Sequence, residues 1–207
     1  MALRNSKSGP AQDTFTLCGE VLGSLAAMFD AHDKYSEGHS QRVTQMAIKI
    51  AEALRMRPED INAVALAAMV HDLGNVGIPP VILNKNSKIS TEEWKIICEH
   101  PNIGADLVSK FAGLDDVAAM IRHHHERWNG LGYPSRLKEN QIPLGARILS
   151  ICESIDAMLS YRPFKKSMTV TDAKADIAKN SGVMFDPTIA KLILDNWEAI
   201  ISPISFI

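Results

Sequence analysis

The sequence predicts an all-α fold in one domain, and two observations carry that prediction. Apolar residues recur at helical spacing, as between His39 and Leu54, where they occupy Val43, Met46, Ala47 and Ile50. No alternating apolar and polar run is long enough to indicate a strand, and 207 residues suit a single ordinary domain. We therefore expect a flexible lead or linker over residues 1–13 and one helical domain over residues 14–207.

The next expected helix opens at Pro58, because proline suits the first turn, where its missing N–H costs nothing. Its apolar residues lie on nearly all sides, so we expect it to be central and buried; they are Ile61, Val64, Leu66, Met69 and Val70. This helix runs directly into His71 and Asp72. Residues 74–89 are rich in glycine, proline and asparagine and are expected to form an ordered loop.

Ser90 and Glu93 form a capping-box pattern that predicts another helix start, and Pro101 should interrupt or kink that helix just after His100. A helix over roughly 115–125 should end at three consecutive histidines, followed by a glycine- and proline-rich loop over 126–143. A long helix should then begin near Leu144, with two or three shorter helices after it.

Composition excludes several classes of protein. Apolar residues make up 46% and charged residues 22%, which is typical of globular domains and not of disordered or fibrous chains. The net charge of −2 gives no basic field for a nucleic acid polymer or an anionic membrane. No apolar run is long enough to span a bilayer, and the 3 cysteines are far apart. We therefore expect a soluble cytoplasmic protein.

Histidines are the residues that point to chemistry. Of the 7, most lie at an expected helix end, a kink or a polar loop: His39, His71, His100, His123, His124 and His125. Imidazole and carboxylate are ligands for zinc, iron and manganese, and an adjacent pair such as His71 and Asp72 can direct two ligands toward neighbouring metals. The alternative from the residues alone is a set of helix caps and a solvated histidine cluster.

The motifs resemble the HD-GYP subgroup of the HD metal-dependent phosphohydrolase superfamily. Residues 71–74 read HDLG and residues 77–79 read GIP, as in that family's HD-x-G-K and G-I-P segment. Residues 124–134 read HHERWNGLGYP, similar to its long signature ending in G-Y-P. The resemblance implies a cytoplasmic helical bundle of the HD type that hydrolyses cyclic dinucleotides, chiefly cyclic di-GMP to pGpG or GMP, in bacterial signalling.

The resemblance also implies two divalent metal ions, most often iron or manganese, although such ligands accept zinc and nickel as well. One ion would take His39, His71 and Asp72, with Glu153 completing it, and the other would share Asp72 and take His100, His124 and His125. Such a pair would hold a bridging hydroxide and neutralise the phosphodiester, which makes His71 and Asp72 essential to catalysis. The implied substrate contacts are Asn75, Tyr133, Asp156, Arg162 and Lys165.

Several positions depart from the family pattern. Asn75 replaces a lysine, which removes a cation from the vicinity of the phosphate, and Glu153 replaces an aspartate with a longer carboxylate. Tyr35 stands where members with three metals carry a glutamate, so we expect two ions. Asn129 replaces an aspartate in the G-Y-P segment, with a minor expected effect.

These departures leave two alternatives to the cyclic di-GMP phosphodiesterase. One is a weak or inactive domain that signals by binding a nucleotide or a protein, and the other is a phosphohydrolase of the same superfamily acting on another nucleotide. An upstream sensor or receiver module and a homodimer are further expectations.

Overall fold

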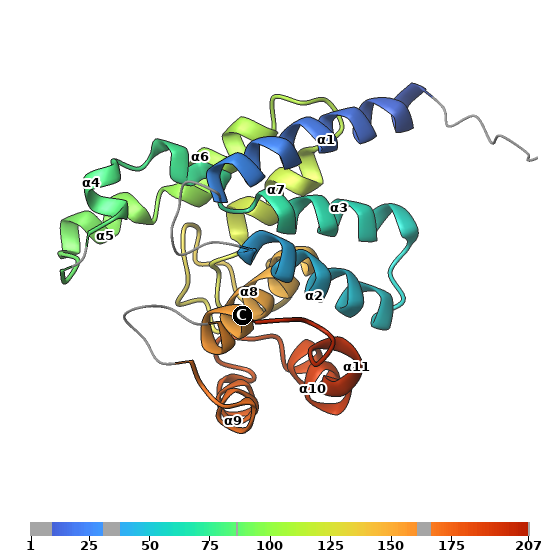
Figure 1. Cartoon of the computed structure of the whole chain (residues 1–207), viewed down its shortest axis with the longest axis vertical. Helices are drawn as coiled ribbons and strands as arrows, with labels where there is room; N and C mark the ends of the chain where they lie inside the picture. The colour runs from blue at the N-terminus through green and yellow to red at the C-terminus, as the bar shows by residue number, and fades with distance from the viewer. Residues whose placement is uncertain (1–9, 31–37, 86, 161–166, 207) are drawn as a thin grey trace, which may run out of the picture.

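The computed structural model describes residues 10–30, 38–85, 87–160 and 167–206 (Figure 1). In chain order its helices are α1 (Pro10–Asp30), α2 (His39–Ala53), α3 (Pro58–Val70), η1 (Leu73–Gly77), α4 (Pro80–Leu83), α5 (Thr91–Ile97), α6 (His100–Val108), α7 (Asp115–His123), η2 (Glu139–Gln141), α8 (Leu144–Leu159), α9 (Val170–Asn180), α10 (Pro187–Asp195) and α11 (Trp197–Ile200), where η marks a 3₁₀ helix. Within the described residues the β structure is a single isolated bridge between Ser181 and Phe185. The predicted all-α fold is confirmed.

The starts of α3 and α5 follow from the local sequence. Pro58 occupies the first turn of α3, and the Ser90 hydroxyl accepts a hydrogen bond from the Glu93 N–H at the start of α5. Pro101 does not kink one continuous helix, because α5 ends at Ile97 and a new helix, α6, begins at His100. The loop expected over residues 74–89 is partly helical, since it contains most of η1 and all of α4. Helix α1 begins at Pro10, inside the range expected as a lead.

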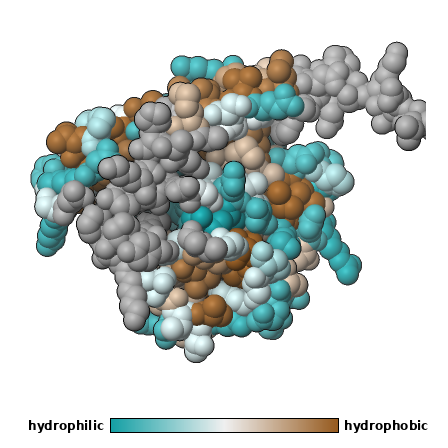
Figure 2. Space-filling view, in the orientation of Figure 1, coloured by the Kyte–Doolittle hydropathy of each residue, from teal (hydrophilic) through white to brown (hydrophobic). Residues whose placement is uncertain are grey.

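The apolar core lies between α2, α3, α7 and α8, and α9 to α11 extend it: α9 and α10 pack against α8, and α10 and α11 pack against α2 (Figure 1). Helix α8 contributes Ile148, Ile151 and Ile155, each fully buried. Helix α3 is central as expected, although Met69 is 36% exposed. This packing brings the ends of α3 and α7 and the starts of α2 and α6 to one place. Figure 2 shows the molecule in the same orientation, and hydrophilic residues gather near the middle of the visible face, where α2 and α8 lie.

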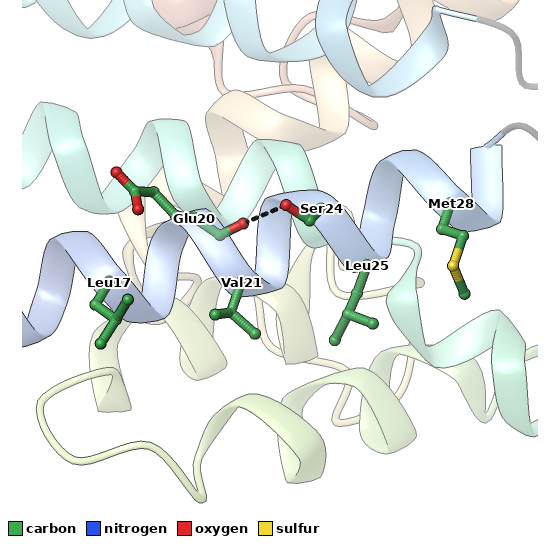
Figure 3. A pocket seen from close by; sticks show the side chains of 6 residues that line it. All are labelled: Leu17, Glu20, Val21, Ser24, Leu25 and Met28. Carbon is green, nitrogen blue, oxygen red and sulfur yellow. Dashed lines mark hydrogen bonds between the residues drawn. The ribbon is translucent and has the colours of Figure 1, made fainter.

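Helix α1 carries an exposed apolar stripe. Leu17, Val21, Leu25 and Met28 are between 40% and 61% exposed, and Figure 3 shows that the first three point to the same side. On this helix the Ser24 hydroxyl donates a hydrogen bond to the Glu20 carbonyl at 2.8 Å. No helix in the described part of the chain is both long and apolar enough to cross a membrane.

Candidate metal centre

Five histidines and one aspartate from separate segments meet beside the core. His39 is the first residue of α2, His71 and Asp72 follow α3, His100 begins α6, and His124 and His125 follow α7. Their ligand atoms form two groups, within each of which every atom lies within 4.8 Å of the others. The first group is His39, His71 and Asp72, and the second is His100, His124 and His125.

The backbone at the helix ends fixes the orientation of three of these rings. The Nδ1–H groups of His71, His100 and His124 donate to the carbonyls of Ala68, Ile97 and Ile121, at 2.8, 2.8 and 2.5 Å. Carbonyls in the last turn of a helix lack partners within that helix, so they are free to accept such bonds. With the proton on Nδ1, a neutral imidazole presents the lone pair of Nε2.

Those Nε2 atoms face one another at short distance. His39 Nε2 lies 3.2 Å from His71 Nε2, and His100 Nε2 lies 3.4 and 3.2 Å from the Nε2 atoms of His124 and His125. Lone pairs held this close repel one another unless a cation binds between them. The donor set of imidazole nitrogen and carboxylate oxygen therefore fits a divalent metal.

Asp72 lies between the two groups. Its Oδ2 is 3.6 Å from His71 Nε2 and 3.9 Å from His39 Nε2, whereas its Oδ1 is 3.5 Å from His100 Nε2. Burial raises the pKa of Asp72, but the surrounding histidines outweigh it and hold that pKa well below its usual range. The carboxylate is therefore charged and turns one oxygen toward each group, as a bridging ligand must.

Burial favours the neutral form of two histidines in the second group, His124 and His125. His124 is fully buried, and this desolvation lowers its pKa well below the usual value. Burial also lowers the pKa of His125. His123 belongs to neither group; its Nδ1 lies 3.7 Å from the buried Glu126 carboxylate.

Asp156 lies behind His39 rather than on the open side of the centre. Its Oδ2 accepts a 2.7 Å hydrogen bond from His39 Nδ1, and its Oδ1 accepts one from Arg42 Nε and one from the Ser160 hydroxyl. Burial raises the pKa of Asp156, but the bonds from His39 and Arg42 dominate and lower it to about 2. Only 1% of the residue is exposed, which does not suit the expected substrate contact. The hydrogen bond from His39 fixes the orientation of that ring, and the substrate contact of Asp156 stays a prediction.

This arrangement predicts the effect of Asp156→Asn. The amide keeps the size but loses the charge that holds the His39 Nδ1 proton, so we expect metal affinity at the first group to fall by about 10- to 100-fold. Affinity at the second group, measured by metal titration, should stay unchanged. Ser160→Ala, which removes one hydrogen bond to the same carboxylate, is the matched control. A parallel loss at both groups would contradict the assignment.

The remaining expected site residues are placed as follows. Asn75 is half-buried in η1, just after Asp72. Glu153 on α8 belongs to neither group, and its Oε2 lies 3.6 Å from His125 Nδ1, so its place on the first metal stays a prediction. The Tyr133 ring stacks on His125, with 4.8 Å between ring centroids and 28° between planes. Tyr35, Arg162 and Lys165 lie outside the described residues.

The loop over 126–143 holds Tyr133 in place. The buried Glu126 carboxylate accepts the Ser135 N–H at 2.7 Å, and the Trp128 N–H donates to the Met184 carbonyl. A Cβ atom on Gly132 would lie 2.3 Å from the Arg127 nitrogen, so only glycine fits where the loop folds back on itself. The chain can therefore bring Tyr133 against His125.

Taken together, the fold and the donor set define a helical protein with a His/Asp centre suited to divalent metal ions. A family model described as "HD domain" matches residues 24–189. The chain therefore belongs to the HD-domain family, and the resemblance expected from its motifs is confirmed.

Two relatives illustrate what the chain is similar to. A cyclic di-GMP phosphodiesterase of Thermotoga maritima is 34% identical over 84% of this chain and 48% of its own length. A 3'3'-cGAMP-specific phosphodiesterase of Vibrio cholerae is 29% identical over 88% of this chain and 35% of its own length. The chain thus spans about half or less of these curated relatives.

A solved structure supports the fold. The crystal structure of a cyclic GMP-AMP specific phosphodiesterase of V. cholerae matches with a TM-score of 0.67 and 21% identity, over 88% of this chain and 49% of that one. At this identity the likeness concerns the fold alone.

Proposed function

We propose that this chain is a metal-dependent phosphodiesterase that hydrolyses cyclic dinucleotides, with cyclic di-GMP as substrate. The observation that carries the proposal is the placement of Asp72, whose two oxygens face separate histidine groups. A shared carboxylate of this kind suits two divalent ions, and iron or manganese is our proposal for them, with zinc and nickel as alternatives.

Two bound ions would neutralise the phosphodiester, lower the pKa of a water molecule and stabilise both oxygens of an in-line displacement. The protein's own residues hold that centre rigidly, through the histidine bonds to helix-end carbonyls and to Asp156. Cleavage of one phosphodiester bond would give linear pGpG, and cleavage of both would give GMP.

The direct test is hydrolysis under anaerobic conditions. Protein reconstituted with iron or manganese is incubated with cyclic di-GMP, 3'3'-cGAMP or cyclic di-AMP, and the products are separated by chromatography. We expect product from cyclic di-GMP, and none from the Asp72→Ala variant. Hydrolysis of a different cyclic dinucleotide alone would overturn the substrate assignment, and no hydrolysis by metal-loaded protein would overturn the activity.

The alternative is a binding module with weak or absent hydrolysis. Two observations favour it: Asn75 offers no positive charge where the family carries a lysine, and the Glu153 carboxylate lies 3.6 Å from His125 of the second histidine group. Equilibrium dialysis of metal-loaded protein with cyclic di-GMP distinguishes the two, since binding without product supports the module. A homodimer and an upstream sensor or receiver module stay predictions, the former to be tested by light scattering.

A further inference from the structure

We propose that a pocket beside the metal centre receives one guanine base of the substrate, with Trp94 as its aromatic wall. This inference rests on the proposed function and names the part of the ligand that the site recognises. No motif in the sequence pointed to Trp94 as a functional residue.

The pocket adjoins the metal centre directly. It has a volume of about 200 Å³, and its lining includes His125 and Glu153 together with Trp94, Tyr133, Ser150 and Ser154. Pockets that hold whole drug-sized ligands measure roughly 300–1,000 Å³, so this one suits a single portion of a larger ligand. A ligand whose phosphate lies at the metal centre would have an adjoining base within reach of the pocket.

Aromatic rings lead from the metal centre to this pocket. Tyr133 stacks on His125, and Trp94 meets Tyr133 nearly at right angles, with 6.2 Å between centroids and 80° between planes. Trp94 is 51% exposed, an unusual exposure for so large an apolar ring. Exposed aromatic faces beside a phosphate site are typical of proteins that stack nucleobases.

The polar groups that line the pocket favour a base that donates hydrogen bonds. The Ser154 hydroxyl donates to the Ser150 carbonyl at 2.9 Å, so its oxygen is left to accept a hydrogen bond. The neighbouring Glu153 carboxylate also accepts, and its charge disfavours a phosphate inside the pocket. Guanine carries an amino donor on the edge where adenine has none, which suits a lining of acceptors. Arg127, exposed and part of the same lining, supplies a cation for a phosphate outside.

The test compares ligands with and without a base. By calorimetry, Trp94→Ala should weaken binding of GMP about 5- to 150-fold, the range for loss of one base–aromatic stack, and leave ribose 5-phosphate unchanged. Trp94→Phe should restore most of the affinity. Leu131→Ala, a truncation at a 72% exposed position in the Tyr133 loop, is the matched control and should bind GMP normally. Equal weakening of both ligands, or none, would overturn the stacking role.

A second variant tests the choice of base. Wild-type protein should prefer GMP over AMP, and Ser154→Ala should reduce that preference about 2- to 10-fold through loss of one neutral hydrogen bond. Equal wild-type affinity for GMP and AMP would overturn the guanine assignment. Because these are binding measurements on mononucleotides, they stand apart from hydrolysis. If the proposed phosphodiesterase activity is wrong, the cyclic dinucleotide will remain uncleaved in the hydrolysis assay, and this result does not depend on the affinity for GMP.

Discussion

Asp72→Asn is expected to lower phosphodiester hydrolysis by on the order of 10³-fold or more, because one carboxylate serves both metal positions. The amide keeps the shape of the side chain, but it has no negative charge to share between the two histidine groups. We therefore also expect the metal content, measured by mass spectrometry after dialysis, to fall from two ions per chain to one or fewer.

Asp195→Asn makes the same chemical change at an exposed surface pair with Lys191 and should leave activity and metal content unaltered. Two retained ions in the Asp72→Asn protein would show that Asp72 does not bridge. Full activity in that variant would remove the basis of the proposed function.

Gly74→Ala is expected to destabilise the fold by about 3 kcal/mol, since overpacking a tight core contact usually costs 1–3 kcal/mol and backbone atoms cannot rotate away. A Cβ atom on Gly74 would lie 1.9 Å from the His100 carbonyl oxygen and 2.6 Å from the Gly104 nitrogen. For a domain of this size the loss corresponds to a fall in Tm of roughly 6–12 °C. Since His100 must shift, the second histidine group should also bind metal more weakly.

Gly19→Ala is the matched control, because a Cβ there meets only the Leu66 side chain at an ordinary 3.8 Å. Within helix α1 this change should be neutral or stabilising by about 0.5–1 kcal/mol. Thermal melts of both variants, with and without metal, measure the difference. An unchanged Tm for Gly74→Ala would mean that η1 and α6 can separate freely.

The residues of the two histidine groups could be predicted from the sequence through the motifs that resemble the HD-GYP family, and four of them are neighbours in the chain. His71 with Asp72, and His124 with His125, are adjacent in the chain and follow the ends of predicted helices. The helices themselves were predictable from periodicity, a capping box and proline positions, as α3 and α5 show. Residues 74–89 were misjudged because their glycines and prolines indicate turns, and η1 and α4 are too short to show a period.

Other features of the site depend on packing between distant segments. The bond between His39 and Asp156 joins residues 117 positions apart, so no spacing rule could show that Asp156 accepts a hydrogen bond from this histidine. Trp94 comes next to Tyr133 only because α5 packs near the loop that precedes α8. The contact between Gly74 and His100 likewise arises from the packing of η1 on α6.

The hydrogen bonds from histidine Nδ1 to helix-end carbonyls link the metal centre to the local stability of single helical turns. If the last turn of α3 or α7 frays, the carbonyl that orients His71 or His124 moves away, and that ring loses its alignment. Opening of one turn and release of a metal would then occur together. The free energy required for this local opening would be well below the free energy of global unfolding. Metal loading is therefore expected to slow amide hydrogen exchange in these two turns while leaving exchange in α9 unchanged.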